Sequence, residues 1–207
     1  MKDNSGKQAH WNHIFRDKPE ESLGWYEQDV SYTLDFFPEG ILAEPQTIFI
    51  AGAGTSQLVD GLLAMGHRLI LNDISDAALA KLRGRIGKQD AVIWLAADLS
   101  QALPDDLPPV DIWIDRAVLH FLIDEQAIKQ YFASLNRLVK SAGFVLLAEF
   151  AETGAERCAG LPVHRYSLAA MNRRMLPVFS LLKHAHYDYI TPAGGNRPYL
   201  YALYQRN

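Results

Sequence analysis

The sequence predicts an α/β fold: a three-layer, doubly wound, mostly parallel sheet of seven strands that ends in an antiparallel hairpin, preceded by an N-terminal helical lid. Three observations lead to this prediction. Continuously apolar segments alternate with amphipathic segments between residues 47 and 150. Two glycines spaced one apart follow the first apolar segment. The chain ends with two strand-like segments that are joined by a short link containing glycine.

Length and composition are those of one globular domain. We expect residues 1–207 to form a single unit, with the lid over residues 1–40 and a Rossmann-like core over residues 47–207. The hydrophobic share of 49% and the charged share of 21% are ordinary values. The formal net charge of −4 comes without the basic patch that is usual in nucleic-acid-binding proteins. A single cysteine, Cys158, leaves no disulfide within the chain.

The pattern of apolar residues disfavours a membrane-spanning helix and a secretory signal. No apolar run approaches the roughly 18 residues that a membrane-spanning helix needs. The N-terminus also lacks the apolar centre of a secretory signal. We therefore expect a cytoplasmic protein with neither a membrane nor a nucleic acid as partner, and the sequence gives no signal of oligomeric state.

The N-terminal 40 residues are rich in aromatic side chains and predict two short helices, over residues 8–17 and 25–37. The second helix is predicted from the near-helical spacing of Tyr26, Val30, Leu34 and Phe37. Pro38 and Gly40 then break the pattern. These aromatic residues could form a lid that excludes water, or they could simply pack against the core.

The middle of the chain alternates between strands and helices, which indicates a parallel sheet covered on both faces. Strands are predicted over residues 47–51, 68–72, 91–96, 111–115 and 144–150. Helices are predicted over residues 56–65, within 73–87, and over 124–143. Ser75 or Asp76 can cap the second helix, while Asp124 caps the third and Gly143 closes it.

The C-terminal tail breaks this alternation. A helix is predicted over residues 167–176, followed by strands over 179–192 and 198–206. The link between these strands, "PAGGN", is too short for a crossover helix. We therefore expect the last two strands to pair antiparallel.

Gly52 and Gly54 stand where the first strand turns into a helix. A residue without Cβ lets the backbone turn tightly and lets a ligand approach the main chain. The following helix directs its free amide groups toward the same space, which suits a nucleotide or an anionic group. The alternative is a plain tight turn.

Three acidic residues follow the ends of successive strands, at the edge where open α/β sheets bind ligands. Asp73 ends the second strand and can accept hydrogen bonds from ribose hydroxyls, or else cap the next helix. Asp98 follows the third strand and can accept a bond from an adenine amino group, with apolar Ile74 and Leu99 on either side of the ring. Its alternative role is also a helix cap. Asp115 ends the fourth strand.

On these residues the sequence resembles the class I S-adenosylmethionine-dependent methyltransferases. Residues 48–82 are similar to the first two motifs of that family, "AADLS" to the third, and "VDIWIDRAVLHFL" to the segment around the fourth strand. The turn "GAGTS", the aromatic "HWNHIFRDKPEESLGWYEQD" and the hairpin tail resemble a narrower group typified by protein-lysine methyltransferases and bacterial relatives. The resemblance covers most of the chain.

The resemblance implies an S-adenosyl-L-methionine cofactor and an acceptor that is a small molecule or a protein side chain. By this resemblance, Gly52, Ala53 and Gly54 would lie near the methionine part and the ribose, and Asp73 would bind the ribose. Asp98, Ile74 and Leu99 would contact the adenine, and Trp11 and Phe15 would cover the cofactor. Asp115 and Arg116, after the fourth strand, are the remaining implied contacts. Ile50 replaces a common acid and Ser56 a common glycine. Neither departure abolishes a cofactor site, and the sequence does not show whether either one weakens cofactor binding.

Methyl transfer needs an acceptor atom aligned with the methyl carbon, and a nitrogen or oxygen acceptor can also need a base. The sequence shows no GxSxG elbow and no His/Cys cluster with zinc spacing, so we expect no metal. His120 and Glu149 are weak catalytic candidates, and Tyr26 and Tyr166 could flank the opening. His120 could instead pair with backbone at a helix start.

Two other functions are also compatible with the sequence. An NAD-dependent oxidoreductase would use the same glycine turn and Asp73, although the third glycine of its pattern is replaced by Gln57. A cofactor-binding regulator without catalysis would account for Ile50, Ser56 and the missing acceptor signature.

Overall fold

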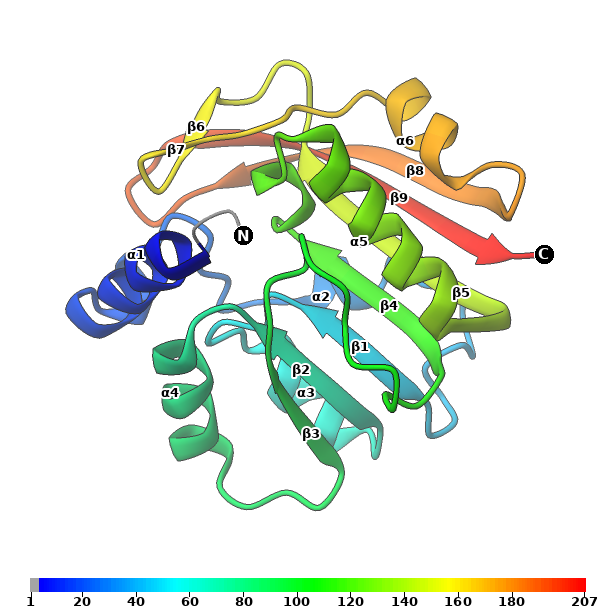
Figure 1. Ribbon diagram of the computed structural model, residues 1–207, viewed down its shortest axis with the longest axis horizontal. Coiled ribbons are helices and arrows are strands. Elements are labelled where there is room, and N and C mark those ends of the chain that lie inside the picture. Colours follow the sequence, from blue (N-terminus) through cyan, green and yellow to red (C-terminus); the bar gives the residue numbers. More distant parts are fainter. Residues whose placement is uncertain (1–3) are drawn as a thin grey trace.

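A computed structural model describes residues 4–207 and contains a sheet of seven strands in the order β3-β2-β1-β4-β5-β9-β8 (Figure 1). The pairs β1–β2, β1–β4, β2–β3 and β4–β5 are parallel. Strand β9 runs antiparallel to both β5 and β8. The predicted α/β fold class, with a mostly parallel sheet and a C-terminal hairpin, is confirmed.

The strands of the sheet are β1 (Thr47–Ala51), β2 (Arg68–Asp73), β3 (Val92–Ala96), β4 (Val110–Arg116), β5 (Val139–Phe150), β8 (Phe179–Ile190) and β9 (Asn196–Arg206). The helices are α1 (Asn4–Asp17), α2 (Ser31–Leu34), α3 (Leu58–Ala64), α4 (Asp76–Ile86), α5 (Glu125–Leu138) and α6 (Leu168–Met175), with short 3-10 turns at Glu20–Ser22 and Leu119–Phe121. A two-stranded ribbon, β6 (Arg157–Cys158) with β7 (Leu161–Pro162), was not expected from the sequence.

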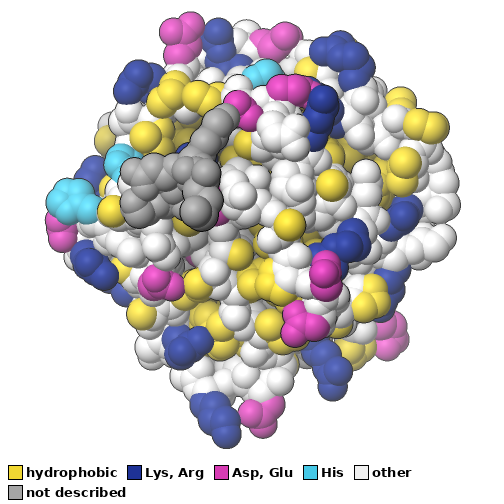
Figure 2. Space-filling view, viewed as in Figure 1, with side chains coloured by type: hydrophobic (Ala, Val, Ile, Leu, Met, Phe, Trp, Pro, Cys, Tyr) yellow, Lys and Arg dark blue, Asp and Glu magenta, His cyan; other side chains and the backbone are white. Residues whose placement is uncertain are grey.

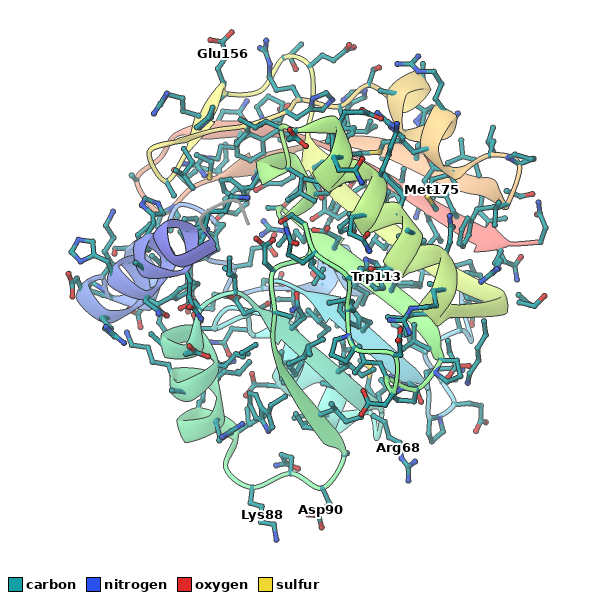
Figure 3. All side chains as sticks on the ribbon, in the orientation of Figure 1. Arg68, Lys88, Asp90, Trp113, Glu156 and Met175 are labelled. Carbon is teal, nitrogen blue, oxygen red and sulfur yellow. The ribbon has the colours of Figure 1, made fainter. Side chains whose placement is uncertain are left out.

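The sheet separates two apolar layers because its central strands are buried on both faces. On one face Phe49 stacks on Trp113, with 3.9 Å between the ring centroids, beneath α5. Figure 3 shows Trp113 at the centre of the molecule. On the other face Ile48 and Ile50 pack with residues of α3 such as Leu62. The three-layer arrangement follows from this two-sided burial.

All carboxyl ends of the parallel strands meet at one edge of the sheet. Helix α1 lies beside this edge, between α4 and the β6–β7 ribbon (Figure 1). Arg68, at the amino end of β2, lies with Lys88 and Asp90 at the opposite side (Figure 3). Charged side chains of both signs are interspersed on the face shown in Figure 2. Within residues 4–207, no helix is long and apolar enough to cross a bilayer.

The helix predicted over residues 25–37 is wrong apart from the four residues of α2. The backbone carbonyls of Trp25 and Tyr26 accept hydrogen bonds from the side chains of Arg116 and Tyr189. These tertiary bonds replace the bonds that would stabilise a helix at this place. The chain from Trp25 to Asp29 is therefore irregular.

The helix predicted over residues 124–143 ends earlier, at Leu138, because Val139 pairs with Val110 as the start of β5. The β4–β5 register shifts between Val110 and Ile112. Gly143 lies at this irregularity, where an added Cβ would approach the Asp111 carbonyl oxygen to 2.9 Å. It therefore permits a bulge rather than closing a helix. The predicted caps at Asp124 and Ser75 are confirmed, with Ser75 preferred over Asp76.

A chain of buried hydrogen bonds connects the sheet to α5. Trp113 Nε1 donates to the hydroxyl of Tyr131 (2.9 Å), which donates to Asp115 Oδ2 (2.7 Å). All three side chains are fully buried. Buried polar groups that lose a partner are costly, so this chain should contribute to stability.

We expect Tyr131→Phe to lower the free energy of unfolding by about 1–3 kcal/mol, because it leaves Trp113 and Asp115 each without one buried partner. Urea unfolding followed by fluorescence measures this change. Tyr187→Phe is the matched control, since Tyr187 makes a ring stack with Tyr32 that does not need the hydroxyl. Equal losses in the two variants would contradict the importance of the buried chain.

Candidate functional site

A cavity of about 330 Å³ lies at the carboxyl ends of β1, β2 and β4. Its walls come from the turns after these strands, from the N-terminal segment and from the β6–β7 ribbon. The lining is mostly apolar with a few polar groups, which is typical of small-molecule sites. The fold therefore forms a hollow at the edge that the sequence indicated.

The glycine turn after β1 borders the cavity with backbone. Gly52 and Gly54 have φ values of +60° and +52°, in the left-handed region that disfavours residues with a Cβ. A Cβ on Gly52 would lie 2.1 Å from Val118 Cγ2. Ala53 is buried beside them, and its amide donates to the Asn72 carbonyl. The turn therefore requires glycine at both positions.

Asp73 lines the cavity at the end of β2. Its Oδ2 accepts from the Gly54 amide (2.9 Å) and its Oδ1 from the Ser75 amide (2.8 Å). Burial raises the pKa of this carboxyl to about 6, against the opposing effect of these backbone hydrogen bonds. Each carboxylate oxygen can accept a further bond. Asp73 thus fixes the glycine turn and can still accept from a ligand.

Asp98 gives the cavity an acceptor that the fold does not use. Its Oδ1 accepts from the Ser100 amide (2.8 Å). Its Oδ2 is buried and has no hydrogen-bond partner among residues 4–207, and the nearest cation, Lys7 Nζ, is 4.0 Å away. Two apolar residues, Ile74 after Asp73 and Leu99 after Asp98, also line the cavity. Such an oxygen suits an amino group held between apolar side chains.

Aromatic rings from the N-terminal segment form another wall. Trp11 meets Phe121 edge-to-face at 4.9 Å and Trp25 at 5.6 Å between ring centroids. Phe15 is 4% exposed, and it both packs in the core and lines the cavity. Packing against the core is therefore confirmed for Phe15, and the lid stays a prediction.

Arg116 lines the cavity, but its guanidinium is already bound by other groups of the protein. Its Nη2 lies 2.7 Å from Glu27 Oε1, its Nη1 donates to the Trp25 carbonyl (3.1 Å), and its Nε donates to the Tyr201 hydroxyl (3.2 Å). It also lies over the rings of Tyr189 and Tyr199. Arg116 therefore anchors the N-terminal segment, a role that the sequence did not indicate.

The expected cofactor contact of Asp115 is not supported, because its fully buried carboxylate does not line the cavity. It accepts from the amides of Val118 (2.9 Å) and Leu119 (3.2 Å) and from Tyr131. Asp115 thereby holds the loop after β4, whose Val118 side chain does line the cavity.

His120 and Glu149 also lie behind the cavity wall and not in it, so neither can touch a ligand there. His120 Nδ1 is 2.9 Å from Glu149 Oε2, and both side chains are fully buried. The His120 amide donates to the same oxygen (3.1 Å). Burial raises the pKa values of Glu149 and Asp115. The pair is structural, although the His120 ring meets the Glu149 carboxylate and not the backbone that its alternative role supposed.

The two tyrosines proposed at the opening differ in position. Tyr26 lines the cavity. Tyr166 is 2% exposed, packs against His164 and does not line the cavity, so its expected place at the opening is wrong.

Arg85, which the sequence did not single out, holds the glycine turn from outside. Its guanidinium donates to the carbonyls of Thr55 (2.7 Å) and Ser56 (2.8 Å) and to Asp60 (2.7 Å). Arg85 lies in the last turn of α4, where basic residues are common. Its position in the sequence therefore did not indicate a role at the glycine turn.

Residues 49–145 match the family model of a methyltransferase domain. A search of curated protein sequences found no match. Three solved structures illustrate the shared fold. A SAM-dependent methyltransferase from Anabaena variabilis is 15% identical, with 100% of this chain and 96% of that chain covered and a TM-score of 0.77.

The second structure is the N-methyltransferase NodS from Bradyrhizobium japonicum with S-adenosyl-L-homocysteine, at 10% identity, with 96% and 97% of the two chains covered and a TM-score of 0.75. The third is the 1,6-didemethyltoxoflavin-N1-methyltransferase of Burkholderia thailandensis with 1,6-didemethyltoxoflavin and S-adenosylhomocysteine. It is 19% identical, with 99% and 87% covered and a TM-score of 0.71. At these identities the likeness shows the fold.

We expect Gly52→Ala to lower the free energy of unfolding by about 2–4 kcal/mol, because backbone strain and the clash with Val118 add together. Gly40→Ala is the control, since Gly40 has φ +86° with nothing within 4 Å of an added Cβ, and it should lose about 1 kcal/mol. Adding Val118→Ala to Gly52→Ala should cost less than the sum of the single losses. Additive losses in urea unfolding would contradict the clash.

Proposed function

We propose how this chain, which is a class I S-adenosylmethionine-dependent methyltransferase, holds its methyl donor in the cavity described above. The domain is inferred to span residues 1–207, with residues 1–40 as a lid, of which residues 1–3 lie outside the described chain. The acceptor is a small molecule or a protein side chain.

The observation that supports this proposal best is the buried, unpaired Oδ2 of Asp98. An adenine amino group placed between Ile74 and Leu99 would satisfy this oxygen. Without such a donor the oxygen is one of the few buried acceptors that a native protein leaves unused. The residues present therefore fit the nucleoside.

The ribose and methionine parts are assigned to the glycine turn. Asp73 would accept from the ribose hydroxyls with the lone pairs that its two backbone bonds leave free. Gly52, Ala53 and Gly54 present main chain to the methionine part. Ile50 and Ser56, the two departures from the family pattern, also line the cavity.

The bound cofactor supplies an activated methyl group on a sulfonium. The task of the protein is then to exclude water and to align an acceptor atom with that carbon. Trp11 and Phe15 are assigned to the cover, because their rings close the cavity over the glycine turn.

Calorimetric titration with S-adenosylhomocysteine tests the proposal directly. We expect saturable binding with one site per chain, and no comparable binding of NAD. A folded protein that binds neither S-adenosylmethionine nor S-adenosylhomocysteine would refute the assignment.

The adenine assignment predicts a preference that a substitution can reverse. S-inosylhomocysteine carries a carbonyl in place of the amino group, so wild-type protein should bind it about 10- to 100-fold more weakly than S-adenosylhomocysteine. In Asp98→Asn the amide oxygen can keep the Ser100 bond while the amide nitrogen faces the ligand. This variant should favour the inosine analogue.

Asp106→Asn, an exposed change in the same loop region, is the control and should leave the ratio of the two affinities unchanged. An unaltered ratio in Asp98→Asn would contradict the adenine assignment.

Cofactor affinity should also depend on pH through Asp73. Only the ionised form of Asp73 can accept ribose hydrogen bonds with both oxygens, because protonation converts one oxygen into a donor. The pKa of this carboxyl is about 6 in the folded protein, well above the usual value. Affinity should therefore be constant above about pH 7 and fall up to about tenfold per pH unit below pH 6. Titrations between pH 5 and pH 8 measure this.

Asp73→Asn should bind weakly and without this pH dependence. Asp76→Asn, a neighbouring exposed carboxylate, should keep the wild-type profile. An Asp73→Asn profile that matches wild type would assign the titration to another group.

A further inference from the structure

One end of the cavity is left over when the nucleoside is assigned to Asp73 and Asp98, and this inference rests on that assignment. The lining residues outside that assignment include Trp25, Tyr26, Glu27, Thr33, Cys158 and Leu161, and we assign them to the acceptor end. Its residues come from the N-terminal segment and the β6–β7 ribbon, away from the turns after β2 and β3. The acceptor must enter here if the donor occupies the other end.

The charges at this end neutralise one another. Glu27 and Arg116 form an ion pair of 2.7 Å, and their side chains are only 10% and 12% exposed. Arg116 uses its other nitrogens on Trp25 and Tyr201, so it offers no free charge to an anion. A lysine ammonium at Glu27 would add a second positive charge beside the Arg116 guanidinium, in a pair whose charges already cancel. Removing either partner from a buried pair is costly, so an uncharged acceptor fits best.

Two other polar side chains at this end, those of Thr33 and Cys158, are also occupied. The Thr33 hydroxyl lies 3.3 Å from that of Tyr201, and Arg197 donates to the Cys158 sulfur at 3.4 Å. What remains is aromatic surface, with Trp25 in edge-to-face contact with Trp11. Such surface favours flat rings by stacking or edge contacts. The cavity of about 330 Å³ must hold the donor as well, so the space that remains suits a small acceptor.

Glu27 retains one site for a hydrogen bond. Its Oε1 lies 2.7 Å from Arg116 Nη2, and among the described residues no hydrogen bond to its Oε2 is found. Burial raises the pKa of this carboxyl against the opposing effect of Arg116, which makes the carboxylate a better proton acceptor.

We propose that the acceptor is a small, uncharged aromatic molecule with an N–H or O–H group, and that Glu27 binds this group and takes its proton. The lone pair of the acceptor nitrogen or oxygen forms a bond to the methyl carbon as the carbon–sulfur bond breaks. The sulfur keeps that electron pair and becomes a neutral thioether. The proton passes to Glu27 Oε2 and then to solvent.

The segment that carries Tyr26 and Glu27 lies between two hollows. A second hollow, of about 320 Å³, lies between the N-terminal segment and β8, and both Tyr26 and Glu27 line it as well as the main cavity. The Tyr26 carbonyl is bound by the Tyr189 hydroxyl. The segment around Tyr26 is therefore the wall that separates bound acceptor from solvent.

The class of acceptor is tested by calorimetry on protein saturated with S-adenosylhomocysteine, at pH 7.5. The uncharged probes are benzimidazole and 2-naphthol, and the charged probes are 2-naphthoate and Nα-acetyl-lysine amide. We expect binding of the uncharged probes alone. Stronger binding of either charged probe, or no binding of the uncharged ones, would overturn the proposal. Absence of S-adenosylhomocysteine binding would instead refute the proposed function.

The role of Glu27 is tested by methyl transfer from radiolabelled S-adenosylmethionine to the same probes. Glu27→Gln should lower the rate about 100-fold and remove the loss of rate at acidic pH, while the affinity for S-adenosylhomocysteine, whose assigned contacts are Asp73 and Asp98, should change far less. Glu27→Asp should recover part of the rate. Glu39→Gln, an exposed change in the same segment, is the control for both measurements.

Urea unfolding shows whether Glu27→Gln remains folded once Arg116 has lost its partner, and Glu27→Asp keeps the test valid if it does not. A wild-type rate and pH profile in Glu27→Gln would overturn the proposal. Binding of both uncharged probes without methyl transfer to either would overturn it as well.

Discussion

The hydrogen bond from the Gly54 amide to Asp73 Oδ2 is the interaction on which the site depends. It ties the turn after β1 to the end of β2, and it lets a single carboxylate define both the shape of the turn and an acceptor in the cavity. The left-handed glycines make this turn possible, and the parallel register brings the two strand ends level. The proposed position of the nucleoside rests on these local constraints.

The fold was predictable because its signals are local. Continuous apolar strands, the short "PAGGN" link and the glycine turn each specify structure within a few residues. The helix over residues 25–37 failed because its carbonyls bind side chains distant in the sequence. The prediction that Gly143 closes a helix was wrong for a related reason, since the bulge at this residue is defined by pairing with the neighbouring strand.

The site was predictable only in part, because the end of a strand does not reveal which way a side chain points. Successive residues of a strand face opposite sides of a sheet. Asp115 therefore contacts Tyr131 on the α5 side, while Arg116, its neighbour, lines the cavity and binds Glu27. Glu149 is buried by the same geometry in β5, and His120, in the turn after β4, is buried against it. The importance of Glu27 depends on Arg116, 89 positions away in the chain, and no pattern within one segment could indicate it.

Arg85 joins four parts of the protein through one guanidinium: α4, the carbonyls after the glycine turn, Asp60 in α3 and Glu20 in the N-terminal segment. This side chain is 26% exposed, so dissolved ions can reach its two carboxylate partners. The bonds to Thr55 and Ser56 involve neutral carbonyls and are screened less. Ionic strength should therefore loosen the attachment of the N-terminal segment sooner than it loosens the glycine turn, so that the cover could open while the floor of the site stays formed.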